Sequence, residues 1–177
     1  MLVIIGPSAS GKTQIVNTLI KFYKMRKMVT YTTRPIRNHE VNGIDYYFIN
    51  KEEFLKKIKD DFFLEYVCYN GYYYGTANNE LSSDKVVIVE KEGLKAYIKK
   101  AKEQIKIVFI RCSKPIRRLR MIERDDDLEC INARLIYDDE IFNDEVRKLA
   151  DLIIDTSNSN VFDDATKIYE FYKFFIF

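Results

Sequence analysis

The sequence predicts an α/β fold of three layers, in which helices cover both faces of a central parallel sheet. Short apolar runs of strand length alternate with longer segments whose apolar residues recur at the helical spacing of about 3.6. A length of 177 residues suits one domain with small insertions. We therefore expect a single domain over residues 1–177.

Four apolar runs are expected to form the parallel sheet, namely residues 2–5, 86–89, 107–110 and 152–154. Between and after them lie five segments with helical periodicity, namely residues 14–23, 92–103, 115–123, 129–149 and 162–174. Because each strand is separated from the next by at least one such segment, the strands can run parallel.

The region between about residues 32 and 83 has a different texture, aromatic, polar and punctuated by glycine. It contains a short helical segment over residues 51–59 and a hairpin signal at Asn70-Gly71. We expect a small mixed β insertion in a core formed by residues 1–31 and 84–177. An insertion here lies over the carboxyl ends of the strands, where open α/β sheets bind ligands.

Composition excludes several classes of protein. The net charge is only +2, so no global field attracts nucleic acid or membrane. Three cysteines without C-x-x-C spacing fit reduced cytoplasmic thiols better than a disulfide frame or a zinc site. We find no secretory leader pattern and no apolar segment of bilayer length, and we expect a cytoplasmic monomer or homodimer. The one histidine, His39, is expected in a turn and argues against a Ser-His-Asp hydrolase.

The first apolar run leads into a motif with the spacing G-x-x-x-x-G-K-[ST] of a phosphate-binding loop. Its residues are Gly6, Pro7, Ser8, Ala9, Ser10, Gly11, Lys12 and Thr13. Glycines let the backbone curl around an anion, so that successive N–H groups point at phosphates. Lys12 would reach the terminal phosphates, Thr13 would ligate Mg²⁺, and the next helix would direct its N-terminus at the phosphates. The loop predicts a nucleoside triphosphate site.

Three further motifs follow the loop in order, TYTTRPIRNHEVNGIDY over residues 30–46, FLEY over 63–66 and NGYYYGT over 70–76. Together with the loop they resemble the guanylate kinase family of P-loop nucleoside monophosphate kinases. The resemblance implies phosphoryl transfer from ATP, with Mg²⁺, to GMP or dGMP. The substrates are then small nucleotides, with no nucleic acid or membrane partner.

The residues themselves suit a nucleoside monophosphate. A dianionic phosphate asks for guanidinium forks and hydroxyl donors, which Arg34, Arg37, Tyr46 and Tyr74 supply. Taken singly, the two arginines are better explained as solvated charges in an exposed turn, and the two tyrosines by packing on an aromatic-rich sheet face. The family resemblance assigns all four to the acceptor phosphate and places Glu40 in the polar lining of the same pocket.

A guanine base presents its N1–H and its exocyclic amine to a single carboxylate, an arrangement that adenine, cytosine and uracil cannot reproduce. The family resemblance assigns this carboxylate to Glu65 and makes Thr30 and Thr76 hydroxyl contacts to the base or its surroundings. From the strand pattern alone, Glu65 could equally face solvent.

A basic cluster spans the two predicted helices around residue 125. Phosphoryl transfer needs cations because negative charge is shared among the oxygens of the migrating group. The resemblance implies a short helical lid over about residues 117–134, with Arg120, Arg124 and Arg134 as its catalytic arginines beside Lys12 and Arg34. Arg117 and Arg118 are expected to form a solvated face. The intervening run of three aspartates, residues 125–127, would repel nucleic-acid phosphates.

The run Glu90-Lys91-Glu92 follows the second core strand, where the family has an acidic pair near magnesium and the guanine. This run can be aligned with the acidic pair in two ways. Either Glu90 and Glu92 match the two acids, or Glu90 matches the second acid and Ile88 stands at the first. We expect Glu90 to be the functional acid, binding GMP and, with Thr13, the metal, while Glu92 stays a second candidate. A further departure from the family pattern is Asp155-Thr156-Ser157 after the last strand.

Two other functions are compatible with the same motifs. One is a related P-loop kinase that acts on a different phosphorylated acceptor. The other is a non-catalytic, guanylate-kinase-like module that binds a protein partner. Such a module would be expected to lose its phosphate loop, whereas this chain retains Gly11, Lys12 and Thr13.

Overall fold

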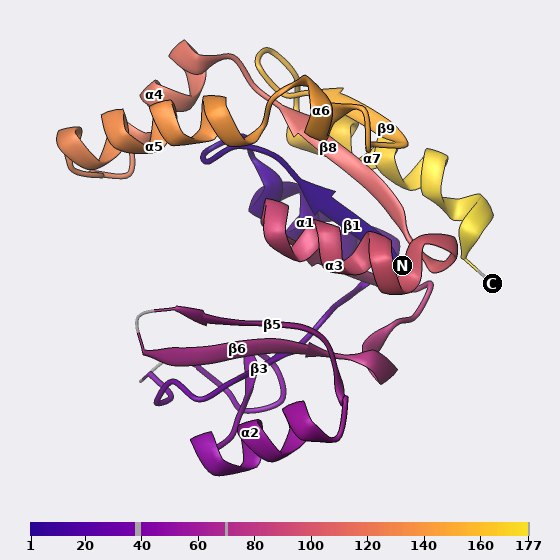
Figure 1. Cartoon of the computed structure of the whole chain (residues 1–177). Coiled ribbons are helices and arrows are strands. Elements are labelled where there is room, and N and C mark those ends of the chain that lie inside the picture. Colours follow the sequence, from indigo (N-terminus) through magenta and orange to yellow (C-terminus); the bar gives the residue numbers. More distant parts are fainter. Residues whose placement is uncertain (38–39, 70, 177) are drawn as a thin grey trace.

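Two β-sheets organise the protein, which is described here from a computed structural model (Figure 1). The structure describes residues 1–37, 40–69 and 71–176, without the side chains of residues 69 and 92. The predictions for His39 and Asn70 therefore lie outside the described residues, as does the side chain of Glu92.

The larger sheet has five strands in the order β2-β7-β1-β8-β9, and every neighbouring pair is parallel. The strands are β1 (Leu2–Ile5), β2 (Arg26–Lys27), β7 (Lys85–Ile88), β8 (Lys106–Arg111) and β9 (Leu152–Asp155). The four expected strands and their parallel order are confirmed. The edge strand β2 was missed because two exposed basic residues give no apolar run.

Helices cover both faces of this sheet, and the residues of β1 alternate between them. Leu2 and Ile4 face α1 (Lys12–Tyr23) and α7 (Val161–Tyr172), which ends in η3 (Lys173–Phe175). Val3 and Ile5 face α3 (Lys91–Ala101), which continues into η2 (Lys102–Gln104). Because both faces are covered, β1 is buried throughout, which explains its unbroken apolar run.

The smaller sheet is mixed, with four strands in the order β4-β3-β6-β5. The strands are β3 (Thr30–Thr32), β4 (Tyr46–Phe48), β5 (Phe63–Tyr69) and β6 (Tyr72–Ala77), and η1 (Asn78–Glu80) leads back to β7. β3 pairs parallel with β4 and antiparallel with β6, which forms a hairpin with β5. The predicted mixed sheet and hairpin are confirmed.

The mixed sheet has its own aromatic core, and it also packs against α3, a helix that covers the larger sheet. Phe54 of α2 (Lys51–Lys59) is fully buried and stacks on Phe63, with ring centroids 4.4 Å apart. Leu64 on β5 points the other way, into the core cluster that contains Leu94 and Tyr97 of α3. β5 therefore divides its side chains between the two parts of the molecule (Figure 1).

Three helices lie between β8 and β9, namely α4 (Lys114–Ile122), α5 (Leu128–Ile141) and α6 (Asp144–Arg147). α4 and α5 share a small core of Met121, Ile131 and Leu135. The prediction of one helix over residues 129–149 was wrong. α5 ends at Ile141, and the Asn143 side chain then caps α6 by accepting hydrogen bonds from the backbone N–H groups of its first turn.

We predict that Phe54→Ala lowers the free energy of unfolding by about 3 to 5 kcal/mol, because it leaves a cavity between Phe63 and Tyr73. Urea unfolding followed by circular dichroism measures the change. The matched control is Leu55→Ala on the same helix, whose leucine is 36% exposed and should cost far less. Equal losses in the two variants would contradict the prediction.

Candidate active site

The phosphate loop joins β1 to α1 and passes very close to β8. Gly6 has φ +148°, and a Cβ atom there would lie 2.3 Å from the carbonyl oxygen of Ile110. Gly11 has φ +95° and precedes α1 without a side-chain cap. The N-terminal N–H groups of α1 are thus left without a capping side chain, which suits an anion.

Lys12 folds back onto the loop that carries it. Its Nζ donates to the carbonyl oxygens of Gly6 at 2.6 Å and Pro7 at 2.8 Å. Burial lowers the pKa of Lys12, while the negative charges of Glu90 and Asp138 act in the opposite direction. The ammonium is therefore held inside the curl of the loop, where a phosphate would be expected.

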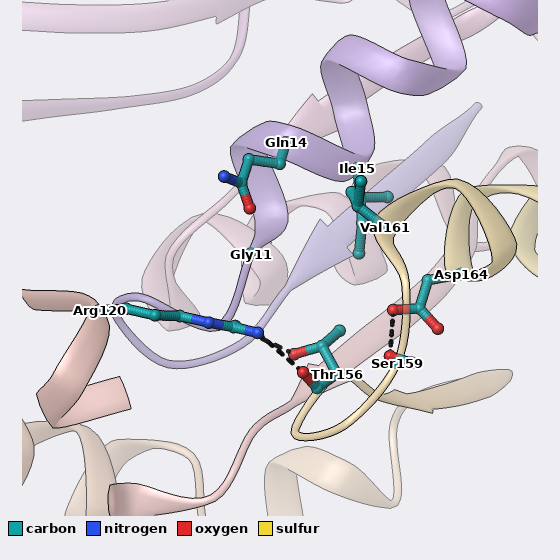
Figure 2. Close-up of a pocket in the computed structure, with 8 residues that line it drawn as sticks. All are labelled: Gly11, Gln14, Ile15, Arg120, Thr156, Ser159, Val161 and Asp164. Atoms are coloured by element: carbon teal, nitrogen blue, oxygen red, sulfur yellow. Dashed lines mark hydrogen bonds between the residues drawn. The ribbon is translucent and has the colours of Figure 1, made fainter. Parts of the chain in front are cut away.

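A pocket of about 170 Å³ adjoins the loop at the start of α1 (Figure 2). Its wall includes Arg120 of α4, whose guanidinium donates to the carbonyl oxygens of Thr156 at 2.8 Å and Ala9 at 3.2 Å. Thr156 in turn donates from Oγ1 to the Ser10 carbonyl oxygen at 2.8 Å. Arg120, expected as a lid arginine, thus ties α4 to the loop and to the segment after β9. Thr156, which the sequence marked only as a departure, is a buried anchor.

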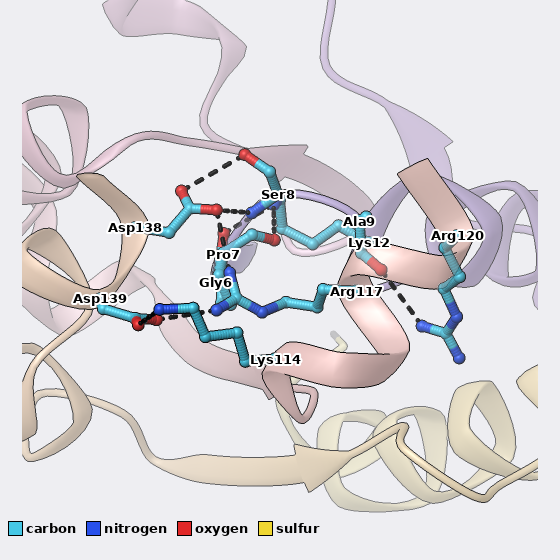
Figure 3. Close-up of polar contacts among 10 residues, drawn as sticks. All are labelled: Gly6, Pro7, Ser8, Ala9, Lys12, Lys114, Arg117, Arg120, Asp138 and Asp139. Carbon is cyan, nitrogen blue, oxygen red and sulfur yellow. Dashed lines mark hydrogen bonds and ion pairs between the residues drawn. The ribbon is translucent and has the colours of Figure 1, made fainter. Parts of the chain in front are cut away.

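A buried ion pair meets the loop from the opposite side (Figure 3). Asp138 on α5 accepts from the Ser8 N–H at 2.8 Å and from Arg117 at 3.0 Å, and Arg117 also donates to Asp139 at 2.8 Å. The expectation that Arg117 forms a solvated face was wrong, because its side chain is 3% exposed. Arg118 lies at the surface side of α4 and donates to Asn132 at 2.6 Å.

On the mixed sheet, several residues expected around the acceptor phosphate lie together. The Arg34 guanidinium donates to Glu40 at 2.5 Å and lies 5.6 Å above the Tyr46 ring. The rings of Tyr46 and Tyr74 are 6.1 Å apart. Glu40 also accepts the backbone N–H of Arg37 at 2.8 Å, whereas the Arg37 residue itself is exposed.

The electrostatics of this cluster follow from its contacts. The hydrogen bond from Arg34 is the main reason that the pKa of Glu40 lies below its ordinary value. Burial raises the pKa of Tyr46, so its hydroxyl stays protonated at neutral pH and remains a donor. The cluster thus offers a guanidinium and phenol donors, with one carboxylate neutralising the guanidinium before a ligand is bound.

Glu65 and Thr76 form a second polar group, opposite each other on β5 and β6. The Thr76 hydroxyl donates to Glu65 Oε1 at 2.8 Å, and burial raises the pKa of Glu65. Tyr97 of α3 is fully buried nearby, and its pKa is also raised by burial. Sequence reasoning missed Tyr97 because it occupies an ordinary core position of a helix. Thr30 is half-buried on β3, opposite Tyr46.

The remaining candidates lie around Lys12 or on the outside of the lid helices. Glu90 is exposed at the start of α3. Its negative charge acts to raise the pKa of Lys12, and the positive charge of Arg124 acts to lower it. Arg134 is exposed on α5 and pairs with Asp126 at 3.2 Å. The structure thus brings Glu90 and Arg124 into the neighbourhood of the loop lysine and leaves Arg134 facing an aspartate.

The oxygen ligands that Thr13 and Glu90 offer suit Mg²⁺. Within the described ranges no group of three or more His, Cys, Asp or Glu side chains forms a metal cage. Thr13, the last residue of the loop, is exposed, and so is Glu90, whose negative charge acts on Lys12. Both side chains carry hard oxygen donors. Mg²⁺ typically takes one or two protein oxygens and completes its shell with phosphates and water, so these residues fit it.

The model of one protein family, guanylate kinase, matches residues 1–170. The chain belongs to the guanylate kinase family. The resemblance seen in the motifs is therefore confirmed, and it extends over nearly the whole sequence.

Guanylate kinases from several bacteria show the same relationship. The chain is 32% identical to the guanylate kinase of Helicobacter hepaticus over 179 residues, covering 90% of each protein. The match to the guanylate kinase of Mycoplasma pneumoniae is 35% identical over 119 residues, covering 63% of this chain but only 50% of that relative. The chain therefore matches half the length of this relative.

The fold of the family is also found among solved structures. A crystal structure of guanylate kinase from Anaplasma phagocytophilum matches with a TM-score of 0.67 and 21% identity, covering 98% of this chain and 84% of that one. The predicted three-layer α/β fold of a guanylate kinase is thus confirmed. None of the helices in the described part of the chain has both the length and the apolar character needed to cross a membrane.

Glu65 predicts a specific pH dependence of stability. Its pKa is raised above 4.5 in the fold, so the native state holds this proton more tightly than the unfolded chain. The resulting stabilisation is complete below about pH 4.5 and is lost as pH rises through the folded-state pKa. We expect the unfolding free energy of wild type, relative to Glu65→Gln, to fall across this window in urea titrations. A constant difference between wild type and Glu65→Gln across this window would contradict the prediction.

Proposed function

We propose that this protein transfers the γ-phosphoryl group of ATP to GMP or dGMP, giving ADP and GDP or dGDP. The observation that carries the proposal is the coexistence of a complete phosphate loop with a shielded carboxylate, Glu65, on the separate mixed sheet. A loop alone would serve any nucleotide hydrolase. A second site with an anion for a base and cations for a phosphate is what a nucleoside monophosphate kinase needs.

Glu65 is the residue we propose for guanine recognition. Its carboxylate would accept the guanine N1–H and the exocyclic amine, with Thr76 holding one oxygen in place. The raised pKa of Glu65 reflects a poorly hydrated site, in which a base that leaves the carboxylate unpaired is strongly disfavoured. Thr30 and Glu90 would complete the nucleoside side of the site.

The acceptor phosphate would be bound by Arg34, Arg37, Tyr46 and Tyr74. Arg34 is neutralised by Glu40, so we expect the phosphate to compete with this carboxylate or share the guanidinium with it. The acceptor oxygen is already anionic at neutral pH. No general base is then required, and the residues need only orient the phosphate for attack.

The loop residues Gly6 to Thr13 would hold the triphosphate, and the pocket beside Arg120 and Thr156 would receive the donor nucleoside. Thr13 and Glu90 are the residues we propose to hold Mg²⁺, which when bound neutralises phosphate charge. Lys12, Arg124 and Arg134 would stabilise charge on the transferring group. For Arg134 this requires leaving Asp126 as the lid, about residues 117–134, closes.

We further propose that residues 32–83 move against the core as a unit when both nucleotides are bound, excluding water from the reaction. The small net charge of +2 supports small nucleotides rather than nucleic acid as partners. A cytoplasmic monomer or homodimer is consistent with cysteines that are free.

A coupled assay of ADP release across nucleoside monophosphates tests the proposal. We expect turnover with GMP or dGMP and little with AMP, CMP or UMP. Turnover with another acceptor and none with GMP or dGMP would contradict the substrate assignment. If titration calorimetry detected binding of neither ATP nor GMP to the folded protein, a non-catalytic module would be the better description.

We predict that Glu65→Gln lowers kcat/KM for GMP by about 100-fold or more, because an amide replaces one of two acceptor contacts with a donor. KM for ATP should stay within about twofold of wild type. Glu52→Gln, an exposed change on α2, is the matched control and should leave both parameters unchanged. Equal losses for ATP and GMP would contradict a role in base recognition.

A further inference from the structure

Asp138 is a buried carboxylate whose main contact is a backbone amide of the phosphate loop. The residue is 4% exposed, on α5. Its Oδ2 accepts the Ser8 N–H at 2.8 Å, and its Oδ1 accepts the Ser8 hydroxyl at 3.3 Å (Figure 3). A carboxylate that accepts a backbone N–H makes one of the stronger hydrogen bonds in proteins. Asp138 therefore fixes one point of the loop main chain.

Arg117 holds this carboxylate in place. It donates to Asp138 at 3.0 Å and to Asp139 at 2.8 Å, and Lys114 donates to Asp139 at 2.7 Å. Burying such a pair costs desolvation that its mutual attraction often only balances, so stability alone is a weak reason for it. Its geometry gives a better reason, because the pair directs one acceptor at the Ser8 amide.

The two following residues of the loop are held as well, each from a different element. The Ala9 carbonyl oxygen accepts from Arg120 of α4, and the Ser10 carbonyl oxygen accepts from Thr156 after β9. Ser8, Ala9 and Ser10 are thus fixed from α5, α4 and the β9 end. Asp138 is the member of this set that binds a loop N–H group rather than a carbonyl oxygen. Asp138 makes no hydrogen bond to Lys12, although its negative charge acts on the pKa of that lysine.

We propose that Asp138 is a positioning residue for ATP binding. Held by its ion pair with Arg117, it keeps the phosphate loop at Ser8 in the shape that receives the triphosphate. The inference rests on the proposed function. An ordered loop does not have to lose conformational freedom when the phosphates arrive, so the anchor strengthens ATP binding without touching ATP. The same contact links the loop to α5, and through it to the lid helices.

Three variants and two ligands test the proposal. We expect Asp138→Ala to weaken MgATP binding by about tenfold, measured by titration calorimetry, and to raise KM for ATP similarly, with GMP affinity unchanged. Asp138→Asn keeps an uncharged acceptor for the Ser8 N–H, so it should recover part of the loss. Asp139→Asn is the matched control. It removes the other carboxylate partner of Arg117 without touching the loop, and ATP affinity should stay within about twofold.

Several results would overturn the inference. These are unchanged ATP affinity in Asp138→Ala, equal weakening in Asp139→Asn, or tighter ATP binding, which would mean that the carboxylate competes with the triphosphate. If Asp138→Ala does not fold, the same criteria apply to Asp138→Asn, for which unchanged ATP affinity would count against the proposal. A wild-type protein that binds GMP but no ATP would overturn the proposed function itself, and this inference with it.

Discussion

The phosphate loop can take its shape only because nothing projects from Gly6 toward β8. The loop crosses the end of that strand so closely that a methyl group would collide with the Ile110 carbonyl oxygen at 2.3 Å. This contact fixes the loop relative to the parallel pair of β1 and β8, and so sets the direction in which α1 leaves it. The anchors at Ser8, Ala9 and Ser10 act on a loop whose base is already determined by that close approach.

The two carboxylates of the mixed sheet differ in their electrostatic setting. Glu40 has a lowered pKa because Arg34 donates to it, whereas Glu65 has a raised pKa because it is shielded from water. The first belongs to a neutralised ion pair and the second to a site that gains from a ligand with N–H donors. In the function proposed above, the guanidinium of the first environment would bind the phosphate of the nucleotide, and the carboxylate of the second would accept the N–H groups of its base.

The sequence was informative wherever a short pattern determines the structure. The loop spacing, the apolar run of β1 and the hairpin between β5 and β6 each follow from local chemistry, and the structure contains all three. In the same way, the helix over residues 51–59 was predicted with the bounds that the structure has.

The sequence did not predict which of several adjacent charged residues is buried, because tertiary packing decides this. In the acidic run Asp138-Asp139-Glu140 only Asp138 is buried, and among the adjacent Arg117 and Arg118 only Arg117 is. Helical periodicity does not separate such residues when all of them are charged. The break at Asn143 was missed for a related reason, since apolar spacing continues across it and only the cap on α6 shows it.

Leu64 limits how the mixed sheet can move. Its side chain is 2% exposed within the core cluster of α3, and a register shift between Phe63 and Glu65 interrupts the regular alternation of β5 at this point. Pulling the mixed sheet away from the core would expose that leucine, at a cost of about 1.5 to 3 kcal/mol. A rotation that leaves Leu64 seated avoids this cost. In the movement of residues 32–83 proposed above, Leu64 would serve as a pivot. Glu65, the next residue on the strand, would then travel least, while Arg34 and its neighbours would move through the larger arc.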